Sequence, residues 1–156
     1  MRNAYIALGR VLYWGIWPGS WLYLRGSRRT RLLLICGDEI LVVSNWLGAG
    51  KWNLPGGGLH KGEDALLGLL REVMEETGIE LRAESVKRLA VEPYSIHGFS
   101  YMCHYFTAVL EAKPETRNQP YEILEVAWTK RTSVSPDMHG PDIIRALELL
   151  DSYRSL

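Results

Sequence analysis

Residues 55–79 read PGGGLHKGEDALLGLLREVMEETGI, a glycine loop followed by a segment whose apolar residues recur every three or four positions. This spacing predicts an amphipathic helix directly after the loop. Asp64 precedes the periodic segment and is a favourable N-cap, while Gly78 stands where helices commonly end in the left-handed conformation. We therefore expect a loop and a helix with defined ends, and a fold arranged around them.

Charged side chains gather on one face of this expected helix. Glu72, Glu75 and Glu76 stand at positions i, i+3 and i+4, within a wedge of roughly 100°. A charged run is usually a solvated face, but like charges at this spacing repel each other, and only Arg71 lies among them. Mg²⁺ prefers carboxylate oxygens and is commonly bound together with a substrate phosphate, so the pattern predicts a metal site. The other stripe is expected to be core: Leu66, Leu69, Leu70, Val73 and Thr77.

From Gly57 to Ile79 the chain resembles the signature box of the Nudix hydrolases, with every fixed position present. A weaker resemblance extends from about Arg25 to Trp128. Members of this family cleave a nucleoside diphosphate linked to another moiety, and they hold Mg²⁺ or Mn²⁺ against the pyrophosphate. The resemblance therefore implies a metal-dependent pyrophosphohydrolase.

The resemblance also implies roles for individual residues. The metal ligands would be the carboxylates of Glu72, Glu75 and Glu76 together with the carbonyl of Gly56. Arg71 would orient these glutamates through charged hydrogen bonds, and Glu63 would brace the box from its loop side. Two other positions depart from the commonest form of the box. His60 stands where many members have an acidic residue, and Gly68 stands where alanine would favour the helix by roughly 1 kcal/mol.

Length and composition favour one globular domain. The chain has 156 residues, of which 47% are hydrophobic, and no linker-like segment divides residues 25–156. Cys36 and Cys103 lie in apolar runs and are expected to be buried free thiols, which indicates a reducing, cytoplasmic environment.

Strand patterns flank the box. Arg31–Cys36 and Ile40–Ser44 are apolar runs separated by a hairpin signal, and strands are also expected at 85–92, 101–111 and 123–130. Pro141–Tyr153 is an amphipathic segment with proline at its start, which predicts a closing helix. These elements define an α/β or α+β fold. The Nudix resemblance implies a mixed sheet between helices.

Residues 1–24 fit the family pattern least and are expected to form a separate helical segment rich in aromatic residues and arginine. Residues 1–31 hold six arginines and no acidic residue, which leaves 12 basic against 18 acidic residues and a charge of −6 for the remainder. Arg10 and the sequence Pro18-Gly19-Ser20 interrupt the apolar run, which argues against a membrane-spanning helix. Packing on the domain or on a second subunit of a homodimer is favoured, and interfacial attachment to a membrane through residues 3–24 stays open.

Hydrolysis of a phosphoanhydride by metal-activated water requires a general base. Glu75 and Glu76 are candidates, and Glu122 and Glu125 on a late strand are equally reasonable. His97 and His104 are weaker candidates.

The box does not identify the substrate, which is expected to be selected by the surrounding loops. Trp46, Lys51 and Trp52 are candidate contacts to a base or a phosphate. Pro93-Tyr94 is a weak hint of a selectivity position. Nucleoside triphosphates, ADP-ribose-like sugars and dinucleoside polyphosphates all remain open as substrates, while a net charge of zero argues only against a strongly basic nucleic-acid-binding domain. Two other readings remain: a catalytically silent nucleotide-binding domain and a membrane-associated module.

Overall fold

The computed structural model describes residues 27–45, 50–96, 99–117 and 123–155, which form a mixed α+β fold. The N-terminal segment 1–24 and the candidate residues Trp46, His97 and Glu122 lie outside the described residues. The elements, in chain order, are β1 (Arg28–Cys36), β2 (Glu39–Asn45), β3 (Trp52–Asn53), α2 (Ala65–Thr77), the 3₁₀ turn η1 (Ala83–Ser85), β4 (Lys87–Ile96), β5 (Phe99–Leu110), β6 (Ile123–Lys130), η2 (Arg131–Ser133) and α3 (Pro141–Arg154).

Six strands form one mixed sheet, the kind of sheet that the Nudix resemblance implies; the short strand β3 was not expected. The strand order is β3-β2-β1-β5-β4, with β6 pairing on β2. β1 and β5 run parallel from Arg28 opposite Met102 to Cys36 opposite Leu110, and the other pairs are antiparallel. β1 begins three residues before the expected start because it pairs with β5 from Arg28 onward. The expected strand at 85–92 begins later, since Ala83–Ser85 forms a 3₁₀ turn.

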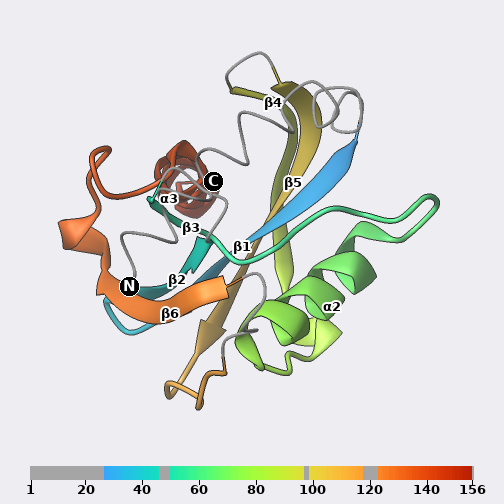
Figure 1. Cartoon of the computed structure of the whole chain (residues 1–156). Helices are drawn as coiled ribbons and strands as arrows, with labels where there is room; N and C mark the ends of the chain where they lie inside the picture. The colour runs from blue at the N-terminus through green and yellow to red at the C-terminus, as the bar shows by residue number, and fades with distance from the viewer. Residues whose placement is uncertain (1–26, 46–49, 97–98, 118–122, 156) are drawn as a thin grey trace.

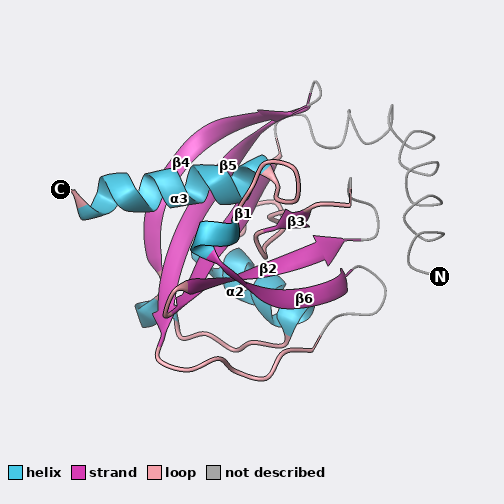
Figure 2. Cartoon of the chain, turned by 90° about the vertical axis from the view of Figure 1, so that its left-hand side faces the viewer, coloured by secondary structure: helices cyan, strands magenta, loops and turns pink. Residues whose placement is uncertain are grey.

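Helices α2 and α3 cover opposite faces of the sheet (Figures 1 and 2). Alternate residues of β1 serve the two faces: Leu32 and Leu34 pack in the cluster that contains Leu69 and Val73 of α2. Leu33 and Ile35 pack in the cluster that contains Ile143 and Leu150 of α3. A strand buried on both faces needs a continuous apolar run, which explains the sequence of β1.

The glycine loop occupies an edge of β1 that β2 leaves open. β1 and β2 are in register only beside their hairpin, at Ile35 with Ile40 and at Cys36 with Glu39. Further along β1, the amide of Leu32 donates to Pro55 O, the amide of Thr30 donates to Gly57 O, and the amide of Leu59 donates to Arg28 O, each at 2.9 Å. The loop is thus held to the core strand by backbone hydrogen bonds, which fixes its position relative to α2.

Two other expectations can be compared with the structure. Cys103 is a buried free thiol, whereas Cys36 is free but only partly buried. Among the described residues, no helix is long and apolar enough to cross a membrane.

Candidate metal and phosphate site

Helix α2 begins and ends where its capping residues predict. The Asp64 carboxylate accepts hydrogen bonds from the amides of Leu66 at 2.9 Å and Leu67 at 3.1 Å. Gly78 adopts the left-handed conformation with φ 72°, and its amide donates to Met74 O at 2.9 Å. These caps determine which side chains of the helix face the glycine loop.

Gly68 has a packing role that helix propensity does not show. A Cβ at this position would run into Leu59 Cδ2 and would lie 3.0 Å from the Glu63 carboxyl carbon. Packing therefore opposes the helix preference for alanine at this position, because the loop packs directly on the helix there. Glycine allows the Glu63 end of the loop to approach α2.

Arg71 contacts three acidic side chains and the loop backbone. Its guanidinium binds Glu63 at two points, Nε to Oε1 at 3.0 Å and Nη2 to Oε2 at 3.1 Å. Nη1 donates to Glu72 at 2.8 Å and to Glu75 at 3.3 Å, while Nη2 also donates to Gly58 O at 3.2 Å. One cation thus offsets the repulsion that the sequence predicts among these carboxylates.

Glu63 is held from both of its sides. Besides Arg71, the amide of His60 donates to Glu63 Oε2 at 2.7 Å. The hydrogen bonds from Arg71, and then the one from His60, lower the pKa of Glu63 from 4.5 to about 2. The carboxylate is therefore charged at every physiological pH.

Glu76 and Arg31 bind the backbone amide and the backbone carbonyl of one loop residue, Gly56. The amide of Gly56 donates to Glu76 Oε2 at 2.7 Å, and Glu76 is only 5% exposed. The carbonyl of Gly56 accepts a hydrogen bond from Nη1 of Arg31. Gly56 itself has φ 128°, and a Cβ there would run into Thr30 O. A side chain at position 56 is excluded on both conformational and steric grounds.

Arg31 is paired with a residue near the other end of the chain. Its Nε lies 3.2 Å from Oδ2 of Asp142, in the first turn of α3. Asp142 also accepts hydrogen bonds from the amides of Leu54 and Ile143, both at 3.0 Å. Burial by itself lowers the pKa of Arg31, but the surrounding charges, with the Asp142 carboxylate first among them, together outweigh burial and raise the pKa. Sequence reasoning missed this pair, although an arginine inside an apolar strand was a usable signal.

The donor set fits a hard divalent cation. The Glu72 carboxylate lies against Gly57, where a Cβ would collide with it, so the glycine provides room for the side chain. Among the residues that the structure describes, no three His, Cys, Asp or Glu side chains form a closed metal-binding group. Mg²⁺ commonly takes only one or two protein carboxylates and fills its remaining positions with water and phosphate oxygens. Glu72, Glu75, Glu76 and the Gly56 carbonyl supply oxygen donors of that kind.

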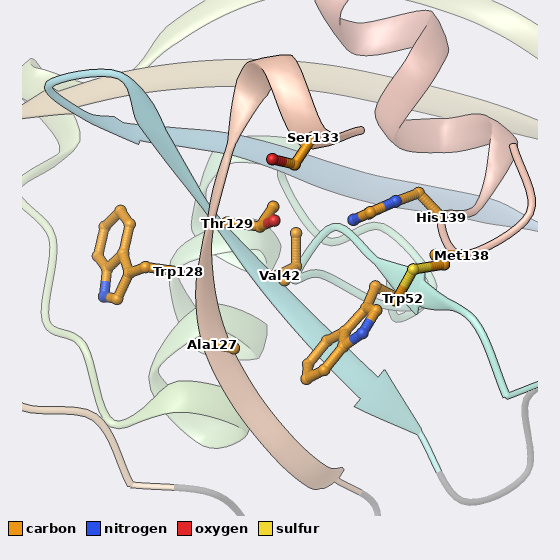
Figure 3. A pocket seen from close by; sticks show the side chains of 8 residues that line it. All are labelled: Val42, Trp52, Ala127, Trp128, Thr129, Ser133, Met138 and His139. Carbon is orange, nitrogen blue, oxygen red and sulfur yellow. The ribbon is translucent and has the colours of Figure 1, made fainter. Parts of the chain in front are cut away.

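The candidate substrate contacts are distributed differently. Lys51 Nζ donates to Pro136 O at 2.6 Å, so its ammonium group is used against a neighbouring loop. Trp52 lines a cavity of about 260 Å³ together with Val42, Ala127, Trp128, Thr129, Ser133, Met138 and His139. Figure 3 shows the His139 ring directed toward Ser133 and Thr129, with Trp52 and Met138 beside it.

This cavity is connected to the glycine loop through the backbone. The amide of Trp52 donates to Met138 O at 2.9 Å, and the amide of Gly140 donates to Trp52 O at 2.7 Å. Pro55 follows Trp52 closely in the chain, and Asp142 follows Gly140. The two segments that line the cavity, around Trp52 and around Gly140, are therefore continuous in the chain with Pro55 and Asp142, whose hydrogen bonds hold the loop.

Two further base candidates lie within the sheet. Glu125 is on β6 opposite Ser44. His104 is on β5 and partly buried, and burial lowers the pKa of its ring. Burial in the sheet makes His104 a poor proton acceptor.

Loop, helix and sheet together define a Nudix fold. The NUDIX domain family model matches residues 26–150, and the chain belongs to this family. Human 8-oxo-dGDP phosphatase NUDT18 is 29% identical over 119 residues, which cover 75% of this chain and 36% of that protein. Its mouse counterpart is 30% identical over 119 residues, covering 72% and 34%. The chain thus spans about a third of the length of these curated relatives.

A solved structure shares the same architecture. The MutT NUDIX hydrolase from Burkholderia pseudomallei superimposes with a TM-score of 0.69 at 23% identity, over 80% of this chain and 98% of that chain. At this identity the likeness concerns the fold.

Proposed function

We propose that this chain hydrolyses a pyrophosphate bond in a nucleoside diphosphate derivative, using a divalent cation held by the glycine loop and α2. The observation that carries the proposal is the binding of Glu76 to the amide of Gly56, which brings a buried carboxylate against the loop that β1 holds in place. Glu72 lies against the next residue of the same loop. Carboxylates packed on a rigid glycine loop suit a cation that bridges protein and phosphate.

The residues of the site have separate tasks. A bound cation would neutralise charge on the phosphate oxygens and lower the pKa of a water molecule. Glu72, Glu75 and Glu76 would hold it, with Mg²⁺ or Mn²⁺ as the suitable ions. Arg71 keeps Glu72 and Glu75 oriented, and Glu63 keeps Arg71 in place through its two-point pair.

The general base is expected to be Glu75 or Glu125. Glu76 is a weaker candidate, since it is nearly fully buried and bound to the Gly56 amide. Glu75 is about half exposed, so water can reach it. Carboxyl-to-amide variants at 75 and 125 separate the two: the base variant loses the acidic limb of the kcat pH profile, whereas the other keeps it.

Trp52 is proposed to contact the base or sugar of the substrate. It lines a cavity that is connected by backbone hydrogen bonds to the loop region, and its indole offers a stacking surface. Because a relative is named as an 8-oxo-dGDP phosphatase, purine nucleoside diphosphates are the first class to test. Trp52→Ala is expected to raise KM by about tenfold, with Trp52→Phe retaining most binding.

A screen that separates the cleavage products by chromatography tests the activity directly, because cleaving ADP-ribose or a dinucleoside polyphosphate releases no inorganic phosphate. It would include 8-oxo-dGDP, ADP-ribose, nucleoside triphosphates and dinucleoside polyphosphates, each with Mg²⁺ and with Mn²⁺. Glu76→Gln should reduce the rate at least a hundredfold, while Glu84→Gln, in an exposed pair with Arg82, should not change it. Nucleotide binding with no cleavage of any compound would instead favour the catalytically silent domain.

A further inference from the structure

Arg29 lies beside the glycine loop but has no part in the contacts described so far. It pairs with Gly58 in an isolated antiparallel bridge between β1 and the loop. Directly paired residues project from the same face, and Arg31 shares that face because it is two positions along the strand. A Cβ built on Gly58 meets nothing within 4 Å. The side of the loop that Arg29 faces is therefore open next to Gly58.

The Arg29 guanidinium lacks the partners that Arg31 has. Its Nε is buried and has no hydrogen-bond partner. Within the described part of the chain, no carboxylate lies within ion-pair distance of it, whereas Arg31 is paired with Asp142. Burial, and then the charge of Arg31, lower the pKa of Arg29. Arg29 as a whole is only partly buried, so an anion can reach its guanidinium and supply the counter-ion that the folded chain does not.

The orientation of Arg29 is fixed by packing. Its guanidinium carbon lies 5.6 Å from the centre of the Tyr101 ring, and Tyr101 is in turn stacked on Tyr94 at 5.1 Å. A cation–π contact uses none of the guanidinium N–H groups as hydrogen-bond donors, and the terminal N–H groups match two phosphate oxygens. Gly58, the bridge partner of Arg29, accepts a hydrogen bond from Arg71, which also binds Glu72, so Arg29 lies beside the loop of the candidate metal site.

We propose that Arg29 binds a phosphate group of the substrate next to the Glu72 side of the candidate metal site. The inference rests on the proposed function, because it supplies that reaction with a second cationic contact. Arg29 is the one arginine on this face whose buried nitrogen has no partner among the described residues, which gives it a role that Arg31 and Arg71 are not placed to fill. The ligand class is a pyrophosphate-containing anion.

A purely structural role for Arg29 makes the opposite prediction about stability. If the residue served only to pack on Tyr101, its removal would lower the melting temperature. If Arg29 binds a phosphate of the substrate, the ligand-free protein holds a partly buried guanidinium without a counter-ion. Its removal then leaves the melting temperature the same or raises it. Arg88 offers a matched control, because it is exposed and lies 5.4 Å from the Phe106 ring in a similar contact.

The experiment measures binding of inorganic pyrophosphate by calorimetry, with and without saturating Mn²⁺, to the full chain and its variants. Arg29→Gln should weaken pyrophosphate binding at least tenfold and leave Mn²⁺ affinity unchanged. Arg29→Lys should recover part of the loss, and Arg88→Gln should bind as wild type does. Melting curves of each variant without ligand give the second readout.

Each result decides the inference. Unchanged pyrophosphate binding in Arg29→Gln, an equal loss in Arg88→Gln, or a lower melting temperature in Arg29→Gln and Arg29→Lys alike would overturn it, as would wild-type protein that does not bind pyrophosphate. The proposed function fails separately: a wild-type chain that binds pyrophosphate through Arg29 but hydrolyses no nucleotide would contradict hydrolysis and retain the anion site.

Discussion

Arg71 and Glu63 form a two-point ion pair across the loop-helix junction, with Nε 3.0 Å from Oε1 and Nη2 3.1 Å from Oε2. Both oxygens of the carboxylate are thus engaged, and the same guanidinium still reaches Glu72 at 2.8 Å. Two-point geometry restricts the arginine to one orientation. The position of Glu72 therefore depends on a residue that we do not expect to bind the metal.

Glu63→Gln tests this dependence through pH. Because the folded-state pKa of Glu63 is lowered from 4.5 to about 2, the stabilising contribution of its charge is fully present above pH 4.5. It is lost as the pH falls from 4.5 toward about 2. Denaturant melts should show the variant less stable than wild type by about 1.5 kcal/mol at pH 7. The difference in stability between variant and wild type should shrink as the pH falls. A difference that is the same at pH 7 and pH 2.5 would contradict the role of the charge.

Gly57→Ala tests the contact between the loop and Glu72. A methyl group there would collide with the carboxylate and displace it, so Mn²⁺ affinity should fall about tenfold or more. Gly58→Ala is the matched control for metal binding, since a Cβ at that position meets nothing within 4 Å. Titration calorimetry with Mn²⁺ compares the two. Equal affinities would show that Glu72 is not a ligand or that it adjusts without loss.

Gly68→Ala sets helix propensity against packing. Propensity favours alanine by about 1 kcal/mol, but the new methyl group would run into Leu59 and crowd Glu63. We expect a net destabilisation of about 1–2 kcal/mol. Leu67→Ala, at a position 62% exposed on the same helix, should change stability by less than about 0.5 kcal/mol. A stabilised Gly68→Ala variant would show that the loop moves away at little cost.

Asp142→Asn tests the buried pair beneath the loop. Removing its charge leaves Arg31 uncompensated in the interior, and breaking such a pair typically costs about 3–5 kcal/mol. Glu92→Gln makes the same chemical change in a pair with Arg145 that is more exposed, where about 1 kcal/mol or less is expected. Chemical denaturation measures both. Similar losses of stability in the two variants would mean that the Arg31 guanidinium is solvated once Asp142 has lost its charge.

The local part of this structure was predictable from the sequence. Asp64 and Gly78 mark the ends of α2 because helix capping depends only on neighbouring backbone groups. The bounds of β6 and the proline that begins α3 were also predicted, since alternation and proline geometry act over a few residues. The mixed sheet followed from the family resemblance.

The contacts that complete the site were not predictable in this way. Arg31 and Asp142 are far apart in the chain. They meet only because α3 packs on the face of the sheet to which alternate residues of β1 point. Arg29 differs from Arg31 in sequence by only two positions, yet one has a carboxylate partner and the other does not. No periodic pattern contains that difference.

The sequence by itself determined the residues of the loop and helix, their spacing and the family, because these depend on short-range geometry and on side-chain chemistry. The tertiary structure decided which edge of β1 the glycine loop occupies, which loop side chains pack on Gly68, and which of two neighbouring arginines has a buried nitrogen without a partner. Those properties depend on burial and on long-range contacts, and both exist only once the chain has folded.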